Sequence, residues 1–276
     1  MVQQRGKIFA NVCVAMDRAG DCAIDIVAKV RWAMKFTGAI IRSIIRAFRG
    51  HTVFRHVDFM TELDKAGPRA VPIVCLISFM VGLIIAFVGN MQLKLFGAEV
   101  YVAALVAISM IRILGAVMTG IIMAGRTGAA YASEIGSMRA NQEIDALVTM
   151  GVSPIDFLVT PRVLALTITM PILTILADIV AIFGGMCVAV AIMNISVVEY
   201  WRTTLEWLTF NNFIIGVLHG WLFGWVIAII GCRCGMRAER TADGIGRAAT
   251  RAVVLGIVGC VVTTAILTVF FNWVDV

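Results

Sequence analysis

Charged residues are scarce in this sequence. Asp, Glu, Lys and Arg make up 14% of its 276 residues, whereas hydrophobic residues make up 61%. A soluble domain averages about 25% charged and about 45–50% apolar residues. The shortage of charge therefore argues against an ordinary soluble domain and indicates a polytopic membrane protein. Residues 1–30 carry charges throughout and lack a continuous apolar run, so they are not expected to be a signal peptide.

The sequence also lacks the motifs of nucleotide hydrolysis and of hydrolase chemistry. It has no G-x-x-x-x-G-K-[ST] loop, no H-E-x-x-H and no G-x-S-x-G. The glycines of residues 125–128 are too close together for a phosphate loop. The three histidines, His51, His56 and His219, form no cluster in the sequence. We expect no catalytic residue and no cofactor in this chain, so an energy-driven activity must use a partner's ATP or an ion gradient.

The cysteine pattern favours no metal site. There are seven cysteines, an odd number, and no C-x-x-C pair. Cys232 and Cys234 are close in sequence, but no histidine or second cysteine pair would complete a tetrahedral set. We expect the cysteines to act as small hydrophobic residues.

Five apolar segments are long enough to cross a bilayer, whose hydrocarbon core of about 30 Å needs about 20 helical residues. They cover approximately residues 70–90, 100–124, 163–193, 212–232 and 252–273. The fourth carries Gly216, Gly220 and Gly224 four residues apart, a spacing that lets another helix approach closely. The prediction is an all-α integral membrane protein with five transmembrane helices in a domain of residues 68–276.

Residues 1–67 form a separate segment in which basic and apolar residues alternate. Between residues 24 and 48, isoleucine, valine and phenylalanine recur at helical spacing among lysines and arginines. A basic amphipathic helix of this kind lies in the membrane interface and is attracted to anionic headgroups. The alternative is a soluble helix that packs on a partner domain.

The distribution of basic residues predicts the orientation. Only Lys94, Arg112 and Arg202 fall outside the segments that share one side of the membrane, and Arg112 falls within a span. By the positive-inside rule, that basic side and the N-terminus are cytoplasmic, and five spans place the C-terminus on the opposite, periplasmic side. This placement explains the net charge of +6 without a nucleic-acid partner.

Residues 125–162, between the second and third spans, are the candidate cytoplasmic coupling region. Asn141 is expected to cap a short helix over residues 142–150, Gly151 to end it in a left-handed conformation, and Ser153-Pro154 to start the next helix. The helix either docks a partner or lies on the membrane. The coupling candidates are Glu134, Arg139, Glu143, Ile144, Asp145, Leu147 and Met150.

Three ionisable residues fall at membrane depth: Arg112, Asp178 and His219. Because such residues are costly in lipid, they should face a cavity, the bundle interior or one another. Arg112 and Asp178 lie at similar depth in successive spans and could pair. This pattern fits a polar patch in a substrate path or a buried pair that fixes helix packing.

Three blocks of the sequence resemble the MlaE (YrbE) permease family, the membrane subunits of ABC transporters that move lipids together with MCE-domain proteins. The most specific is AGRTGAAYASEIGSMRANQEIDALVTMGVSPIDFLVTPRVLA, from Ala124. The others are GIGRAATRAVV, residues 244–254, and QLKLFGAEVYVAALVAISMIRILG, residues 92–115. The resemblance covers approximately residues 57–271.

The resemblance implies an ABC-exporter-like permease that forms a homodimer around a lipid cavity in a bacterial inner membrane. It also implies a cytoplasmic ABC ATPase that binds ATP and Mg, an MCE-domain protein, often a STAS-domain protein, and phospholipid as substrate. We expect Gln92, Arg112, Ile113 and Asp178 to line the lipid cavity or its gate. The sequence departs from the family pattern at Ile113, where the family has Glu, and at Ala116, where it has Pro.

Two other functions remain open at this point. An ion-coupled secondary transporter would use Asp178 and His219 as a proton relay. A non-transporting protein would only anchor an MCE ring in the membrane.

Overall fold

The computed structural model describes residues 34–46 and 56–274, which belong to two compact units, residues 1–52 and 53–276. In the first unit, residues 34–46 form a helix, within the interfacial helix predicted for residues 24–48. The remainder of that predicted helix lies outside the described residues.

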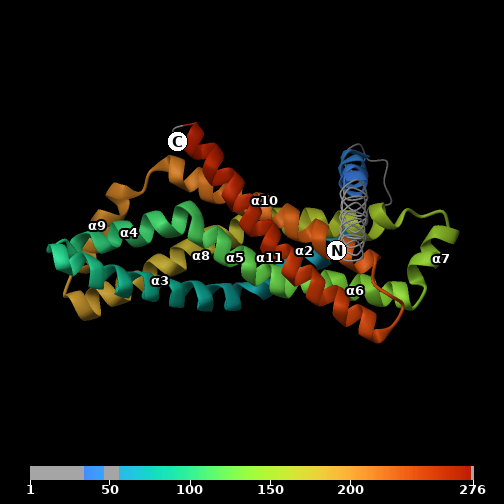
Figure 1. Ribbon diagram of the computed structural model, residues 1–276, viewed down its shortest axis with the longest axis horizontal. Coiled ribbons are helices and arrows are strands. Elements are labelled where there is room, and N and C mark those ends of the chain that lie inside the picture. Colours follow the sequence, from blue (N-terminus) through green and yellow to red (C-terminus); the bar gives the residue numbers. More distant parts are fainter. Residues whose placement is uncertain (1–33, 47–55, 275–276) are drawn as a thin grey trace, which may run out of the picture. The chain divides into compact units, whose positions relative to one another are not determined.

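The second unit contains five helices that are long and apolar enough to cross a membrane, as the sequence predicts (Figure 1). They extend over Val57–Phe96, Glu99–Ala140, Ile155–Met193, Phe210–Met236 and Ala242–Trp273. The chain is thus a multi-pass membrane protein. In the described residues every regular element is helical.

The first, second and third long helices are built from several consecutive elements. The first comprises α2 (His56–Ala66), η1 (Pro68–Ala70), α3 (Val71–Leu93) and η2 (Lys94–Phe96). The second comprises η3 (Glu99–Tyr101), α4 (Val102–Ser109), η4 (Met110–Leu114), α5 (Gly115–Met123), η5 (Ala124–Gly128) and α6 (Ala129–Ala140). The third comprises η6 (Ile155–Val159) and α8 (Thr160–Met193).

The other elements are single helices. The short helices are α7 (Glu143–Thr149) and α9 (Val197–Trp207), and the last two long helices are α10 (Phe210–Met236) and α11 (Ala242–Trp273). Figure 1 shows α7 and α9 at opposite ends of the long helices. Tyr200 of α9 is buried and donates a hydrogen bond to the carbonyl oxygen of Ile182 at 3.1 Å, which ties α9 to α8.

The second long helix extends 16 residues beyond the end of the predicted span at residue 124 and ends at Ala140. Gly128 and Gly136 do not break the helix because they pack against other parts of the chain. Gly128 faces Ile227 of α10, and Gly136 faces Ala238 and Ile245 near the start of α11. Tertiary packing thus overrides the low helix propensity of glycine. Only α7 is a separate short helix in the region between the second and third spans.

Glycines bring the long helices into backbone contact. A Cβ at Gly82 of α3 would overlap the carbonyl oxygen of Ala181 in α8, and a Cβ at Gly216 of α10 would overlap that of Ile111 in η4. Gly224 faces the Leu166 carbonyl oxygen of α8 in the same way. The close approach predicted for the glycine face of the fourth span is therefore confirmed.

Candidate functional site

The short helix α7 joins the second long helix to the third. It begins at Glu143, after Gln142 adopts a left-handed conformation with φ of 62°, and Gly151 follows it with φ of 76°. The left-handed Gly151 agrees with the prediction. The N-cap prediction for Asn141 is wrong: Asn141 ends α6, and its Nδ2 donates to Glu143 Oε1 at 3.2 Å rather than capping a backbone amide.

The side chains of α7 divide between a buried face and an exposed one. Ile144 is buried and Leu147 is half-buried, so these two coupling candidates hold α7 against the rest of the chain. Glu143 is exposed, and Val148 and Met150 have 58% and 68% of their surface exposed. The exposed face combines a carboxylate with apolar side chains, a combination that suits a protein groove.

Two polar contacts connect this region to the fourth and fifth long helices. Asp145 Oδ2 accepts from Arg240 Nη2 at 2.6 Å, and Arg240 lies between α10 and α11. Arg139 of α6 donates to the carbonyl oxygen of Met236 at the end of α10. Asp145 and Arg139 therefore have partners within the chain, and a displacement of α7 would reach α10 and α11 through them.

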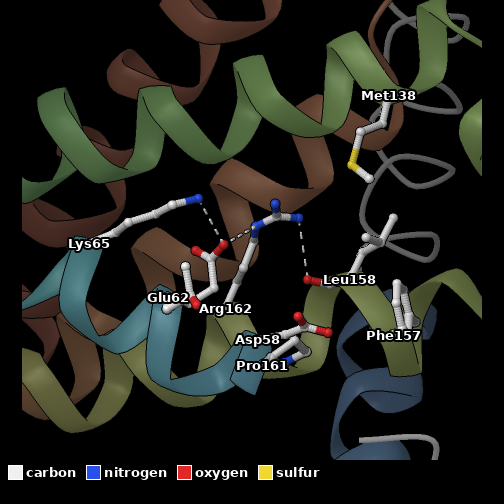
Figure 2. Close-up of a pocket in the computed structure, with 9 residues that line it drawn as sticks. Asp58, Glu62, Lys65, Met138, Phe157, Leu158, Pro161 and Arg162 are labelled. Atoms are coloured by element: carbon white, nitrogen blue, oxygen red, sulfur yellow. Dashed lines mark hydrogen bonds and ion pairs between the residues drawn. The ribbon is translucent and has the colours of Figure 1, made fainter. Parts of the chain in front are cut away.

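Glu134, the remaining coupling candidate, belongs to a charged cluster between α2, α6 and α8. Its Oε2 lies 2.9 Å from Arg162 Nη2 and its Oε1 lies 3.3 Å from Lys65 Nζ. Glu62 Oε1 lies 3.3 Å from Lys65 Nζ and 3.7 Å from Arg162 Nε. Figure 2 shows the Glu62, Lys65 and Arg162 side chains converging.

Glu62 and Arg162 form the buried part of the cluster, whereas the Lys65 and Glu134 side chains are each more than a third exposed. Arg162 and Glu62 are each 7% exposed, and the Arg162 guanidinium lies 5.7 Å from the centre of the Tyr131 ring. Reasoning from the sequence missed Glu62, Lys65 and Arg162 as site residues. The available signal was an arginine at the head of an apolar span and a Glu–Lys pair three residues apart, which is common on exposed helices.

At membrane depth the structure does not form the expected Arg112–Asp178 pair. Arg112 Nη1 instead donates to Asn212 Oδ1 of α10 at 3.1 Å. Asp178 is buried against Gly115, and its Oδ1 has no hydrogen-bond partner in the described residues. Arg112 lies in the π-helical turn η4, whose extra residue changes the direction of the side chains. Sequence spacing alone does not reveal such a turn.

The other expected cavity or gate residues occupy different environments. Gln92 is exposed near the end of α3, and Ile113 is half-buried in η4. His219 is buried in α10 between the rings of Phe223 and Phe271, with centroid distances of 5.9 and 6.2 Å. Its Nδ1 lies 2.7 Å from the Ile215 carbonyl oxygen.

Comparison with known proteins identifies the family. The model of the permease MlaE family matches residues 59–270, nearly the whole second unit. The chain belongs to the MlaE permease family. The resemblance of the three sequence blocks to this family is thereby confirmed.

Several named relatives of this MlaE-family chain are similar over most of its length. A probable ABC transporter permease protein of Rickettsia conorii is 36% identical over 86% of this chain and 89% of its own. The intermembrane phospholipid transport system permease protein MlaE of Haemophilus influenzae is 33% identical, with coverages of 70% and 74%. The chloroplastic protein TRIGALACTOSYLDIACYLGLYCEROL 1 of Arabidopsis thaliana is 28% identical, with coverages of 83% and 65%.

Proposed function

We propose that this chain is the permease subunit of an ABC transporter that moves phospholipid or a similar hydrophobic substrate. A separate cytoplasmic ATPase drives it, and the substrate passes between the inner membrane and an MCE-domain partner. The observation that carries the proposal is α7, which presents exposed Val148 and Met150 while Asp145 and Arg139 connect its surroundings to α10 and α11. The phospholipid substrate is supported by the name of the Haemophilus relative.

In this proposal α7 is the coupling helix. Closure of the ATPase subunits on ATP and Mg displaces α7, and the Asp145–Arg240 ion pair carries the displacement to the loop between α10 and α11. The buried Ile144 makes α7 move with the helices rather than slide over them. The bundle then opens a lipid cavity near Arg112, Ile113 and Gln92.

The cavity is completed by a second copy of the chain. Much of the surface of α11 is apolar and exposed in one copy, including Val254, Val258, Val261 and Ile266. Lipid and a second protomer are the two environments that accept such a surface in a membrane. The proposed orientation places the N-terminus and α7 in the cytoplasm and the C-terminus in the periplasm, where an MCE ring binds. A STAS-domain protein completes the cytoplasmic assembly.

The docking role of α7 predicts a specific loss of ATPase binding. Replacing both Glu143 and Asp145 by Lys should weaken association with the ATPase roughly tenfold or more, because two exposed charges are reversed at the contact. The measurement is co-purification of the ATPase with the membrane-inserted chain, together with the rate of ATP hydrolysis by the complex.

Two further variants separate docking from coupling. Glu199→Lys with Glu206→Lys makes the same charge change on α9, at the opposite end of the long helices, and should leave ATPase binding unchanged. Arg240→Ala removes the partner of Asp145 and should preserve binding while lowering lipid transfer per ATP hydrolysed. An intact complex with normal hydrolysis in the double-lysine variant would place the coupling element elsewhere.

A proton-coupled transporter is the second candidate, because Asp178 Oδ1 and His219 Nε2 are buried without a hydrogen-bond partner in the described residues. The two mechanisms predict opposite results for Asp178→Asn. Under ATP-driven transport, lipid transfer in proteoliposomes that contain the ATPase should be retained, because no step requires the Asp178 carboxyl group to carry a proton. It should also survive collapse of the proton gradient.

A proton relay would instead require the carboxyl group, so Asp178→Asn would abolish transfer at every pH. If the chain only anchored an MCE ring in the membrane, it would transfer no lipid. Blocking ATP hydrolysis would then leave the lipid distribution unchanged. Transfer that depends on ATP and tolerates Asp178→Asn excludes both alternatives.

A further inference from the structure

The short helix α9 has three distinct faces. Tyr200 and Thr204 are buried and form the face that packs on the rest of the chain. The second face consists of exposed apolar side chains, namely Val197, Val198, Trp201 and Leu205. The third face is exposed and charged, and it consists of Glu199, Arg202 and Glu206. Because successive residues of a helix are rotated by about 100°, each of these three sets occupies its own side of α9.

The buried face determines how α9 is rotated and where it lies. The Tyr200 hydroxyl donates to the Ile182 carbonyl oxygen of α8, and Tyr200 belongs to a buried cluster that includes Ala107 and Ile111. Ile182 lies 11 residues before Met193, the last residue of α8, which is roughly 16 Å along the helix. The Tyr200 side chain therefore reaches the side of α8 well before its end, and a buried hydroxyl that would lose its acceptor resists rotation of α9.

The apolar face of α9 is large and uncovered within one copy of the chain. Val198 has 78% of its surface exposed, Leu205 has 56% and Trp201 has 44%. Burying a large apolar side chain is worth about 1.5–3 kcal/mol relative to leaving it in water, so several of them on one face indicate an apolar environment.

The surface of α8 beside this face indicates that the environment is lipid. The exposed apolar side chains of α8 include Ile168, Ile172, Ile179, Phe183 and Val190. These residues lie within about 60° of one another around the helix and form a single stripe along a membrane-crossing helix. The Trp201 ring lies 6.2 Å from the Phe183 ring, measured between centroids. Phe183 has stripe residues before and after it, so the apolar face of α9 continues the lipid-facing surface of α8.

The charged face of α9 completes the pattern of a helix at a membrane surface. A helix with one apolar and one charged side lies along the interface, where tryptophan rings are also enriched. The start of the helix suits this position, because Ser196 Oγ accepts from the Glu199 amide at 3.1 Å. That amide would otherwise lack a partner within the helix. Glu199, Arg202 and Glu206 can then face headgroups and water while the apolar face contacts acyl chains.

We propose that the apolar face of α9 binds the acyl chains of lipids in the membrane leaflet on the side opposite α7. Figure 1 shows α9 at that end of the long helices. Trp201 lies at the boundary between acyl chains and headgroups, and the surface anchors this end of the bundle in one leaflet. The inference uses only the membrane-spanning fold and does not depend on lipid transport.

The test is photo-crosslinking of the full chain in vesicles of phosphatidylethanolamine and phosphatidylglycerol, with no other protein present. A benzophenone amino acid replaces Val198 or Leu205 on the apolar face, and Glu199 or Glu206 as matched controls on the charged face. All four side chains are exposed, so the replacement disturbs no packing. Each control is the sequence neighbour of a test position, so the two differ chiefly in rotation about the helix axis. Mass spectrometry of the intact chain counts the molecules that carry one added lipid.

We expect the lipid adduct to be several-fold more abundant at Val198 and Leu205 than at Glu199 and Glu206. Equal abundance on the two faces would overturn the inference, because α9 would then have no lipid-facing side. Absence of the adduct at both Val198 and Leu205 would also overturn it. A covalent dimer of the chain at these two positions in place of the lipid adduct would overturn it as well and assign the apolar face to a second copy.

Discussion

Gly216→Ala should lower the free energy of unfolding by at least about 3 kcal/mol, the upper end of the usual cost of overpacking. The added Cβ would overlap the carbonyl oxygen of Ile111, which belongs to the backbone of η4 and cannot rotate away. Relief requires α10 and η4 to separate, and that separation would also disturb the Arg112–Asn212 hydrogen bond. The measurement is thermal unfolding of the detergent-solubilised chain, followed by size-exclusion chromatography.

Gly125→Ala is the matched control, because a Cβ at Gly125 meets no atom within 4 Å. Alanine is favoured over glycine inside a helix by about 1 kcal/mol, so this variant should be as stable as wild type or slightly more stable. If Gly216→Ala unfolded at the same temperature as Gly125→Ala, close backbone contact between α10 and η4 would not be a feature of the folded protein.

Arg162→Ala should destabilise the protein by about 1–3 kcal/mol, because it leaves the buried Glu62 carboxylate with only the partly exposed Lys65 as its partner. Glu62 would keep only Lys65, and Glu134 would lose its contact of 2.9 Å. The same change would weaken the junction of α2, α6 and α8. The apparent melting temperature of the purified chain measures the effect.

Arg69→Ala is the control for a charged pair on the surface. Arg69 Nε lies 2.8 Å from Asp64 Oδ2, but both side chains are largely exposed, so its loss should cost less than about 1 kcal/mol. Replacing Glu62 and Arg162 together by Met should recover part of the loss, since an apolar pair leaves no buried charge without a partner. Equal melting temperatures for Arg162→Ala and Arg69→Ala would show that the cluster does not stabilise the junction.

The helical class, the five spans and the family could be read from the sequence. Each depends on local properties: continuous hydropathy identifies a membrane-crossing helix, and three contiguous blocks carry the family resemblance. The glycine face of α10 was also predictable, because a spacing of four residues places Gly216, Gly220 and Gly224 on one side of a helix. Such periodic patterns require no knowledge of the neighbouring helix.

The partners of the charged side chains were decided by the tertiary structure. Arg112 contacts Asn212 rather than Asp178 because a π-helical turn changes its direction. Asp145 pairs with Arg240, which lies 95 residues away in the sequence. The cluster of Glu62, Glu134 and Arg162 likewise joins three separate helices. Which residues meet in such sites depends on crossing angles, helix rotation and local turns, and these are set by the packing of the whole bundle.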